Sequence, residues 1–116
     1  MYQYKAKIDR WVDGDTVLVT VDLGFYAKHV ARLRLARIDA HELNGETKYK
    51  RRMARSARFQ ADQMCPVGSE VIIETSKTKR DMYARYITEI IFEGKNISDE
   101  LLRLKVVKKY KANKKE

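Results

Sequence analysis

The chain of 116 residues has little cysteine, proline or histidine. Its one cysteine, Cys65, excludes a disulfide within the chain. With only two histidines, His29 and His41, the chain also lacks any recognisable zinc motif. Cys65 precedes Pro66 at an expected helix end, and no neighbouring residues suggest activation of its thiol. We therefore expect Cys65 to be structural rather than a nucleophile.

Long apolar runs are absent as well. No segment approaches the roughly 20 apolar residues that a membrane-spanning helix needs. Residues 1–5 have no apolar core of the kind that secretory signal peptides carry. We therefore expect a cytoplasmic protein that does not bind membranes, and the sequence does not indicate its oligomeric state.

Positive charge is what the chain has in excess. It contains 25 lysines and arginines against 16 acidic residues, a net charge of +9, and its isoelectric point is about 9.7. The excess lies in residues 48–58, 77–85 and 105–115. A basic balance favours an anionic partner, and we expect DNA or RNA. The alternatives are that the charge serves solubility, or that it belongs to a charged tail alone.

Hydrophobic periodicity predicts a single small domain with both strands and helices. The 44% of hydrophobic residues suffices for one core. Alternating and β-branched patterns predict strands at residues 2–12, 16–23, 28–38, 70–75 and 83–92. Helical spacing predicts helices at 50–64 and, after an N-cap at Ser98, at 98–106.

This order of elements predicts a mainly β, α+β fold. It suits a five-stranded β-barrel of the OB type with two α-helices, or three if the C-terminal segment adds one. A generic α+β sheet has the same order of elements. We expect a domain over residues 1–107 and a basic, frayed tail over 108–116.

Two acidic residues fall at strand ends that a barrel can bring together. Asp15 lies in the turn Asp13-Gly14-Asp15-Thr16, in which we expect Gly14 to supply a positive φ, and Asp39 follows the third strand. Each alone is an ordinary turn or strand-end acid. Together they suit a hard divalent cation such as Ca²⁺ or Mg²⁺, with the carbonyl of Ala40 as a further ligand.

The same region offers a base and cations for phosphate chemistry. Glu42 is a candidate general base, although a solvated loop acid would have the same spacing, and its neighbour His41 competes for that role. Arg34 and Arg85 can donate paired hydrogen bonds to phosphate oxygens, or can simply form surface salt bridges. Tyr83 can contact a phosphate, stack on a base or be partly buried in a strand.

Taken in order, the three motifs resemble the staphylococcal nuclease (thermonuclease) family, the SNase-like OB-fold domain. They are Asp-Gly-Asp-Thr at 13–16, Arg-Ile-Asp-Ala-His-Glu at 37–42 after Arg34, and Asp-x-Tyr-x-Arg at 81–85. The likeness runs from about Ile8 to Val107. It implies an OB-fold barrel with three helices in the full-length form. It also implies an endonuclease with Ca²⁺-dependent hydrolysis of DNA and RNA that leaves 3′-phosphate ends.

The resemblance also implies a role for individual residues. The metal ligands correspond to Asp15, Asp39 and the Ala40 carbonyl, and the general base corresponds to Glu42. The phosphate-binding arginines correspond to Arg34 and Arg85. The resemblance further places Asp13 beside the metal ligands and Tyr83 against a nucleotide phosphate.

The chain departs from the family pattern at a few positions. His41 stands where the family commonly has proline, which leaves the backbone before Glu42 less constrained. Ala84 stands in place of the usual glycine, and we expect the third helix to be missing or reduced to the tail. We interpret these changes as tuning of the activity. The alternative function is a non-catalytic OB-fold module that binds single-stranded nucleic acid or a protein partner. A purely structural basic protein is a further alternative.

Overall fold

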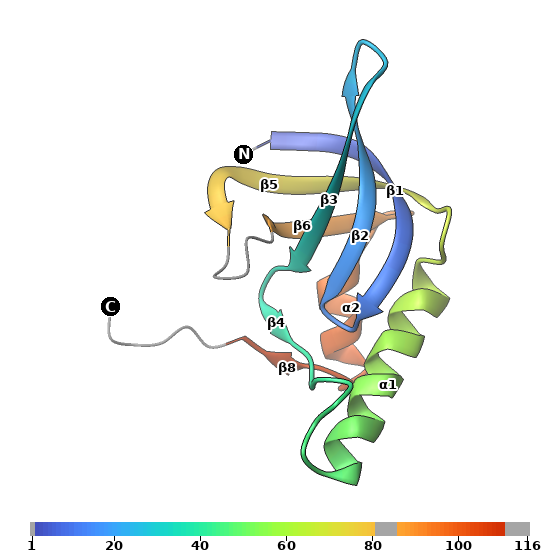
Figure 1. Cartoon of the computed structure of the whole chain (residues 1–116), viewed down its shortest axis with the longest axis vertical. Coiled ribbons are helices and arrows are strands. Elements are labelled where there is room, and N and C mark those ends of the chain that lie inside the picture. Colours follow the sequence, from blue (N-terminus) through green and yellow to red (C-terminus); the bar gives the residue numbers. More distant parts are fainter. Residues whose placement is uncertain (1, 81–85, 111–116) are drawn as a thin grey trace.

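The computed structural model describes residues 2–80 and 86–110, with the side chains of 76–80 excepted. Five long strands make up most of the main sheet: β1 Tyr2–Asp13, β2 Thr16–Gly24, β3 Ala27–Leu35, β5 Glu70–Arg80 and β6 Tyr86–Phe92 (Figure 1). The short strand β7 Lys95–Asn96 extends the sheet beside β6. The helices are α1 Lys48–Met64 and α2 Ile97–Arg103. Three strands of two residues complete the described elements: β4 Ile38–Asp39, β7 Lys95–Asn96 and β8 Lys108–Lys109.

The five long strands close into a barrel. Antiparallel pairing gives the order β3-β2-β1-β5-β6, and a parallel pairing between β3 and β6 joins the two edges. This closing pair places Leu33 opposite Tyr86 and Arg34 opposite Ile87. The closure confirms the five-stranded OB-type barrel with two helices and excludes the open α+β sheet.

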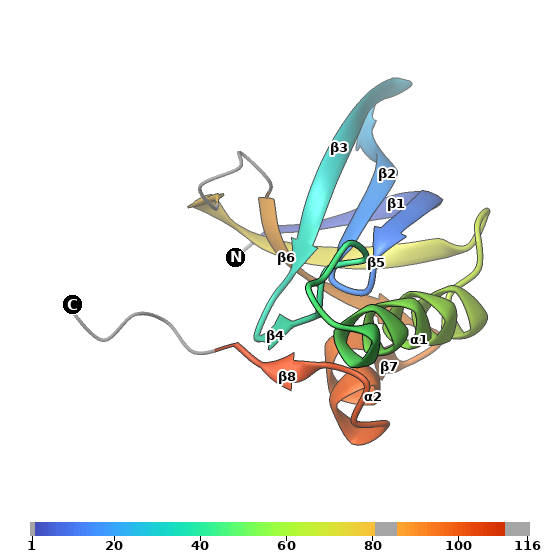
Figure 2. The same ribbon diagram turned by 60° about the horizontal axis from the view of Figure 1, so that its bottom comes forward.

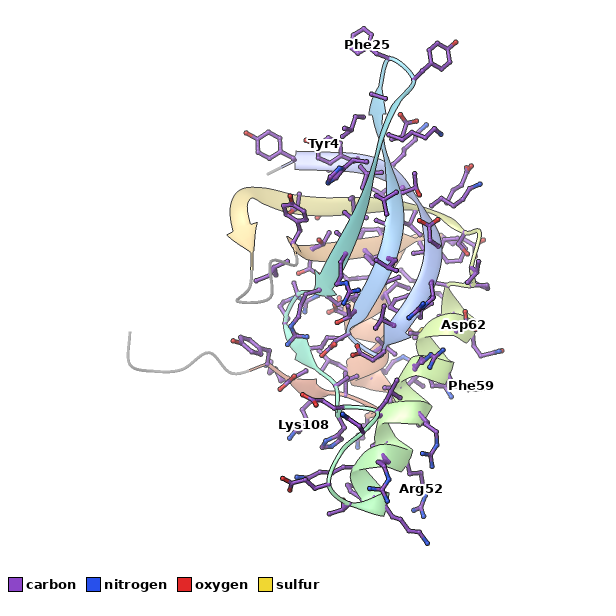
Figure 3. The ribbon with its side chains drawn as sticks, viewed as in Figure 1. Tyr4, Phe25, Arg52, Phe59, Asp62 and Lys108 are labelled. Atoms are coloured by element: carbon purple, nitrogen blue, oxygen red, sulfur yellow. The ribbon has the colours of Figure 1, made fainter. Side chains whose placement is uncertain are left out.

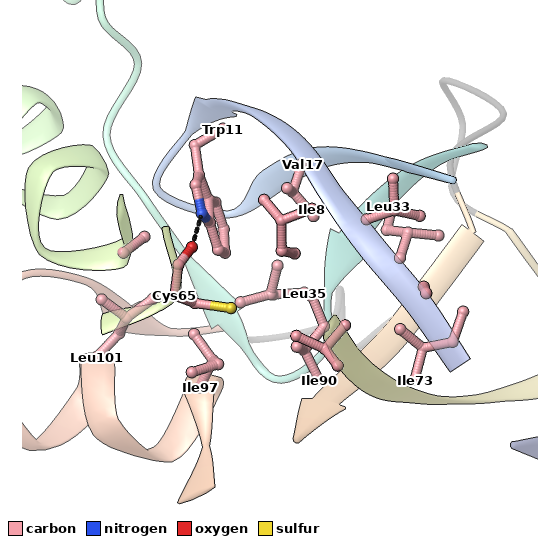
Figure 4. Close-up of a cluster of buried hydrophobic side chains, with 14 of the residues drawn as sticks. Ile8, Trp11, Val17, Leu33, Leu35, Cys65, Ile73, Ile90, Ile97 and Leu101 are labelled. Atoms are coloured by element: carbon pink, nitrogen blue, oxygen red, sulfur yellow. Dashed lines mark hydrogen bonds between the residues drawn. The ribbon is translucent and has the colours of Figure 1, made fainter. Parts of the chain in front are cut away.

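The hydrophobic core runs through the barrel and continues onto the helices. Ile8, Leu35 and Ile90 from three strands are fully buried there, beside Ile97 and Leu101 of α2 (Figure 4). The long helix α1 buries only alanines, which are Ala54, Ala57 and Ala61. Small side chains let a helix approach the neighbouring backbone closely. Helix α1 therefore lies near the turn between β1 and β2, which carries Asp15.

The side chain of Trp11 links the barrel to the end of α1. Its indole Nε1 donates a hydrogen bond of 2.8 Å to the backbone carbonyl of Cys65. Cys65 is a free, fully buried cysteine, and burial raises the pKa of its thiol to about 11. A thiol of that pKa stays protonated at neutral pH and is a poor nucleophile, in line with the structural role that we expected.

Several local features differ from the sequence-based prediction. The strand predicted over 28–38 ends at Leu35, because Arg37 takes a left-handed φ of 71° and starts the separate strand β4. The second helix is capped by Asn96, whose side chain accepts a hydrogen bond from the Asp99 N–H, and not by Ser98, which is buried. Gly14 is also not among the positive-φ residues, so the reason for a glycine there must be steric.

The segment predicted as a frayed tail begins with ordered structure. Strand β8 pairs with β4, so that Lys109 lies opposite Ile38 and Lys108 opposite Asp39 (Figure 2). The N–H of Tyr110 then donates a hydrogen bond of 2.9 Å to the carbonyl of Arg37. Residues 111–116 lie outside the described part of the chain. Within residues 2–80 and 86–110, no helix is both long and apolar enough to cross a bilayer.

Candidate metal and phosphate site

The turn between β1 and β2 packs closely against α1 and against Ala40, which follows β4. This close packing is possible because Gly14 has no side chain. A Cβ added there would lie 2.5 Å from the Cβ of Ala57 and 3.2 Å from the Cβ of Ala40. Real Cβ atoms do not approach each other to 2.5 Å, so only glycine allows this packing. Close packing of the turn brings the neighbouring Asp15 to the backbone of Ala40.

Asp15 is a buried acid with several hydrogen bonds. Its Oδ2 accepts a hydrogen bond of 2.9 Å from the Ala40 N–H, and its Oδ1 accepts one of 3.1 Å from the Thr16 hydroxyl. Burial alone would raise the pKa of Asp15. The hydrogen bonds with Asp13 and Ala40, together with the charge of Arg34, outweigh burial and lower that pKa. Asp15 is therefore ionised at neutral pH, as a metal ligand must be.

Asp13 has the opposite electrostatic environment. Its Oδ1 accepts a hydrogen bond of 3.1 Å from the backbone N–H of Asp15. Burial, followed by the hydrogen bond and charge of the Asp15 side chain, raises the pKa of Asp13 to about 6. The two acids of this turn therefore ionise in sequence, Asp15 first and Asp13 only near neutrality.

Arg34 connects the two predicted metal ligands. Its Nη1 lies 2.5 Å from Asp15 Oδ2, and its Nη2 lies 3.4 Å from Asp39 Oδ1. Nη2 also donates a hydrogen bond of 3.1 Å to the carbonyl of Ile38. The Arg34 and Asp15 side chains are only 11% and 8% exposed, whereas that of Asp39 is 52% exposed. The two carboxylates that we expected to converge therefore do so, on opposite nitrogens of one guanidinium.

Tyr110 is a residue of this site that the sequence analysis did not include. Its ring lies over the Arg34 guanidinium, 5.5 Å from Cζ to the ring centroid, and β8 fixes its position beside β4. A ring in that place restrains the arginine through a cation–π contact. Two sequence signals pointed to it: a single aromatic residue in a lysine-rich segment, and a rough correspondence to the late substrate-side tyrosines of longer family members.

The remaining predicted residues lie in loops. Ala40 and Glu42 follow β4, and the carbonyl of Glu42 accepts a hydrogen bond of 3.0 Å from the Gly45 N–H. The side chain of Glu42 is exposed. His41 meets the ring of Tyr49 edge to face, with 6.2 Å between ring centroids. Tyr83, Ala84 and Arg85 lie outside the described residues, so their predicted roles stay predictions.

Comparison with known proteins identifies the family. The family described as staphylococcal nuclease homologue matches residues 32–116, which is more than half of the chain. The chain belongs to the staphylococcal nuclease family. No curated protein matches it significantly. The family match includes Arg34, Asp39, Ala40 and Glu42 but begins after Asp15. The case for Asp15 therefore depends on the contacts described above.

Membership of the staphylococcal nuclease family indicates a nuclease-type or nucleic-acid-binding module. The donor atoms at the site are compatible with a hard cation, because Asp15 and Asp39 supply carboxylate oxygens and Ala40 supplies a carbonyl. Within the described ranges, no three His, Cys, Asp or Glu side chains group as a metal cluster would require.

A second arginine shows why Arg34 is the one that reaches the site. Arg37 donates two hydrogen bonds to the Glu89 carboxylate, at 2.8 and 2.9 Å, and lies 2.8 Å from Asp99. These contacts join the β3–β4 turn to β6 and α2. The Arg37 guanidinium is paired with Glu89 and Asp99, and these contacts help to fix the start of β4. Arg34 is the arginine that contacts Asp15 and Asp39.

Proposed function

We propose that this protein is a Ca²⁺-dependent endonuclease that hydrolyses phosphodiester bonds of DNA or RNA and leaves 3′-phosphate ends. The observation that carries the proposal is the convergence of Asp15 and Asp39 on the guanidinium of Arg34. An acidic pair with an arginine between them offers the two things that a phosphodiester site needs, ligands for a cation and a donor for phosphate oxygens.

In this proposal Asp15, Asp39 and the carbonyl of Ala40 hold the cation. A bound divalent cation would supply Lewis-acid stabilisation at a phosphate oxygen. The cation would also neutralise the negative charge of Asp15, a role that Arg34 has in this structure. The guanidinium of Arg34 could then turn its donors towards the phosphate. Arg85 is assigned the same role by its place in the Asp-x-Tyr-x-Arg motif.

Glu42 is the general base of the proposed reaction. Its carboxylate accepts a proton as the water oxygen attacks phosphorus, and the bond from phosphorus to the 5′-oxygen breaks. The 5′-oxygen leaves with a proton from solvent or from an arginine, and the phosphate stays on the 3′ side. Arg34 and Arg85 stabilise the additional negative charge on the phosphate oxygens during this step. The exposed position of Glu42 after β4 lets solvent reach it.

The test is cleavage of a labelled single-stranded DNA with Ca²⁺ or with a chelator. We expect cutting only with Ca²⁺, and products that a polymerase extends only after a phosphatase has removed the 3′-phosphate. Replacing the base in Glu42→Gln should slow cleavage by roughly 10²- to 10⁴-fold. The matched control is Glu46→Gln, an exposed glutamate of the same loop, which should cut at the wild-type rate.

The same experiment separates this proposal from the non-catalytic alternative. A protein that shifts the labelled DNA in a gel but leaves it intact with every divalent cation would be a binding module. Equal cleavage by Glu42→Gln and wild type would reject Glu42 as the base while keeping the nuclease.

A further inference from the structure

The exposed side of helix α1 carries a row of positive charges. The helix packs against the barrel through its buried alanines, Ala54, Ala57 and Ala61. Steps of three and four residues along its remaining surface connect four exposed cations, which are Lys48, Arg52, Arg55 and Arg58. We call these four residues the α1 basic face. Figure 3 shows Arg52 pointing away from the barrel.

Helix stability does not account for these charges. Like charges three or four residues apart on a helix repel each other, and each member of the α1 basic face has another member at that spacing. The helix dipole favours acidic residues in the first turn and basic residues in the last turn. Helix α1 has neither, since it begins at Lys48 and its one acidic residue, Asp62, lies near its C-terminal end. A row of charges that destabilises its own helix indicates a role outside that helix.

The four cations are also unpaired in the described part of the chain. Within residues 2–80 and 86–110, none of them forms a salt bridge with an acidic side chain. Their neighbour Arg51 differs, because it is partly buried and donates a hydrogen bond of 2.8 Å to the carbonyl of Gly45. Arg51 therefore holds a loop, whereas the α1 basic face is open to an external anion.

A chain of phosphates fits this row of charges better than a membrane does. The helix rises by about 15 Å from Lys48 to Arg58. Each strand of a nucleic acid duplex carries a phosphate about every 3.4 Å along the axis, so this length corresponds to about four phosphates. A helix that lies on a membrane inserts an apolar side into it, but the apolar side of α1 is buried against the barrel.

The α1 basic face begins beside the loop that carries the proposed base. The Glu42 carbonyl accepts a hydrogen bond from the Gly45 N–H, and the Gly45 carbonyl accepts one from Arg51. On the buried side of the same helix, Ala57 packs against the turn that carries Asp15. The basic face is therefore about one helix diameter, roughly 10 Å, beyond the candidate site. A nucleic acid chain bound at that site must extend by several nucleotides to reach it.

We propose that the α1 basic face binds the phosphate backbone of a nucleic acid chain, several nucleotides away from the phosphate at Arg34. The contacts are to phosphates alone, so the bases and their pairing do not matter. Chain length then determines affinity, because only a chain that extends past the candidate site gains these contacts. The inference rests on the proposed function only for the position of the cut bond, since binding to α1 requires neither a cation nor cleavage.

The first test uses wild-type protein in the presence of a chelator, so that nothing is cut. The Nε–Hε signals of Arg52, Arg55 and Arg58 report contact with phosphate directly. We would compare a trinucleotide with a strand of roughly 15 nucleotides, which extends about 50 Å, at equal phosphate concentration. We expect only the longer strand to move the three signals. An abasic strand and a duplex of that length should move them as well.

A double variant measures how much the α1 basic face contributes to affinity. Arg52→Gln with Arg55→Gln removes two cations and keeps a good helix former at both positions. A plot of log affinity for the longer strand against log salt concentration should become less steep by about 0.7 for each lost phosphate contact. For two contacts this change corresponds to roughly 25-fold weaker binding in 0.1 M salt, taking 1 M salt as the reference.

Two controls separate a local effect from net charge and from loss of folding. Lys7→Gln with Lys28→Gln removes two exposed cations of the barrel strands and should bind nearly as tightly as wild type. The α1 variant should unfold at the same temperature as wild type or a higher one, because repulsion along the helix is reduced. If it unfolds earlier, the wild-type arginine signals decide the question.

Three results would overturn the inference. The first is an equal loss of affinity in the α1 variant and in the barrel control, which would reduce the effect to net charge. The second is arginine signals that stay still with the longer strand or move only when it carries bases. The third is binding of vesicles of phosphatidylserine and phosphatidylcholine that the α1 variant loses while its nucleic acid binding is unchanged, which would assign the face to a membrane.

Failure of this inference is distinguishable from failure of the proposed nuclease. Binding that depends on the α1 basic face, without cleavage under any conditions, would contradict only the nuclease. Ca²⁺-dependent cleavage by a variant that binds the longer strand as tightly as wild type would contradict only this inference.

Discussion

The guanidinium of Arg34 lies between Asp15 and Asp39, 2.5 Å from the first carboxylate and 3.4 Å from the second. In this arrangement one arginine neutralises the acids that we propose as cation ligands. Cation binding and the position of Arg34 are therefore coupled, because a cation would reduce the need of Asp15 for the arginine.

Removing Arg34 should destabilise the protein more without Ca²⁺ than with it. In Arg34→Ala the buried carboxylate of Asp15 keeps its hydrogen bonds but loses its ion pair, which should cost about 3 kcal/mol in chelator. Saturating Ca²⁺ should recover part of that loss, since ligands that bind the folded state stabilise it. Urea unfolding with and without Ca²⁺ measures both values. Arg32→Ala, an exposed arginine of the same strand, should change stability by less than about 0.5 kcal/mol.

Adding one methyl group at Gly14 should disturb the turn that carries Asp15. The new Cβ would clash with Ala57, so Gly14→Ala should lose about 1–3 kcal/mol of stability and should also cut DNA more slowly. Ala57→Gly removes the clashing atom but weakens the helix by about 1 kcal/mol. The double variant should therefore be more stable than the sum of the two single effects. Strictly additive losses in urea unfolding would show that Ala57 is not the obstacle.

The ion pair between Arg37 and Glu89 should make stability fall in acid. Burial would raise the pKa of Glu89, but the hydrogen bonds from Arg37 and Asn96 outweigh it and lower the pKa below its ordinary value of 4.5. A carboxylate with a lowered pKa in the folded state contributes stability above the unfolded pKa. That contribution is lost as the pH falls below about 4.5 and through the folded pKa.

The comparison that isolates this effect is wild type against Glu89→Gln. We expect the free energy of unfolding of wild type to fall more steeply than that of the variant as the pH is lowered below 4.5. Urea unfolding at several pH values gives both curves. Parallel curves for the two proteins would mean that Glu89 does not carry the acid sensitivity.

The tip of the β2–β3 hairpin should become more stable when its aromatic residues are replaced. Phe25 and Tyr26 have positive φ angles of 54° and 63°, and their side chains are fully exposed. Figure 3 shows Phe25 at the end of the hairpin, beyond the barrel. Two-residue turns with positive φ at both positions favour Asn-Gly. Phe25→Asn with Tyr26→Gly should raise stability by about 1 kcal/mol.

Alanine at the same two positions is the matched control. Phe25→Ala with Tyr26→Ala removes both rings but keeps a Cβ at each positive φ, so it should bring little gain. An equal rise in the unfolding temperature for the Asn-Gly and Ala-Ala variants would attribute the change to loss of the exposed rings instead.

Most of the barrel could be predicted from the sequence because its strands have regular patterns. The β-branched run from Thr16 to Leu23 is a strand in the structure. The division of residues 28–38 into β3 and β4 could not be predicted, because the left-handed residue that separates them is Arg37 and not a glycine. Asn96 and Ser98 both belong to residue types that favour the N-cap position. The fold decides which of them caps α2, since Ser98 is buried and Asn96 accepts the hydrogen bond from the helix.

The candidate site was predictable in part for a similar reason. The motifs around Asp15 and Asp39 identified the acidic pair, but the sequence alone does not place Arg34 between the two acids. Tyr110 lies over Arg34 because β8 pairs with β4, and a contact between residues far apart in the chain is not visible in a lysine-rich segment. The need for glycine at position 14 also comes from a tertiary contact, because Ala57 of α1 lies too close to allow a side chain there.

The measurement that tests the proposed site most directly is a Ca²⁺ titration followed at the amide of Ala40. That N–H donates its hydrogen bond to Asp15 Oδ2, so a cation bound by Asp15 must change its signal. We expect a saturable shift of the Ala40 amide with a midpoint on the order of 1 mM, as for weak protein calcium sites. The shift should persist in Asp9→Asn, an exposed acid of β1, and disappear in Asp39→Asn. An Ala40 signal that does not respond to Ca²⁺ in wild type, or that responds equally in Asp39→Asn, would contradict the site.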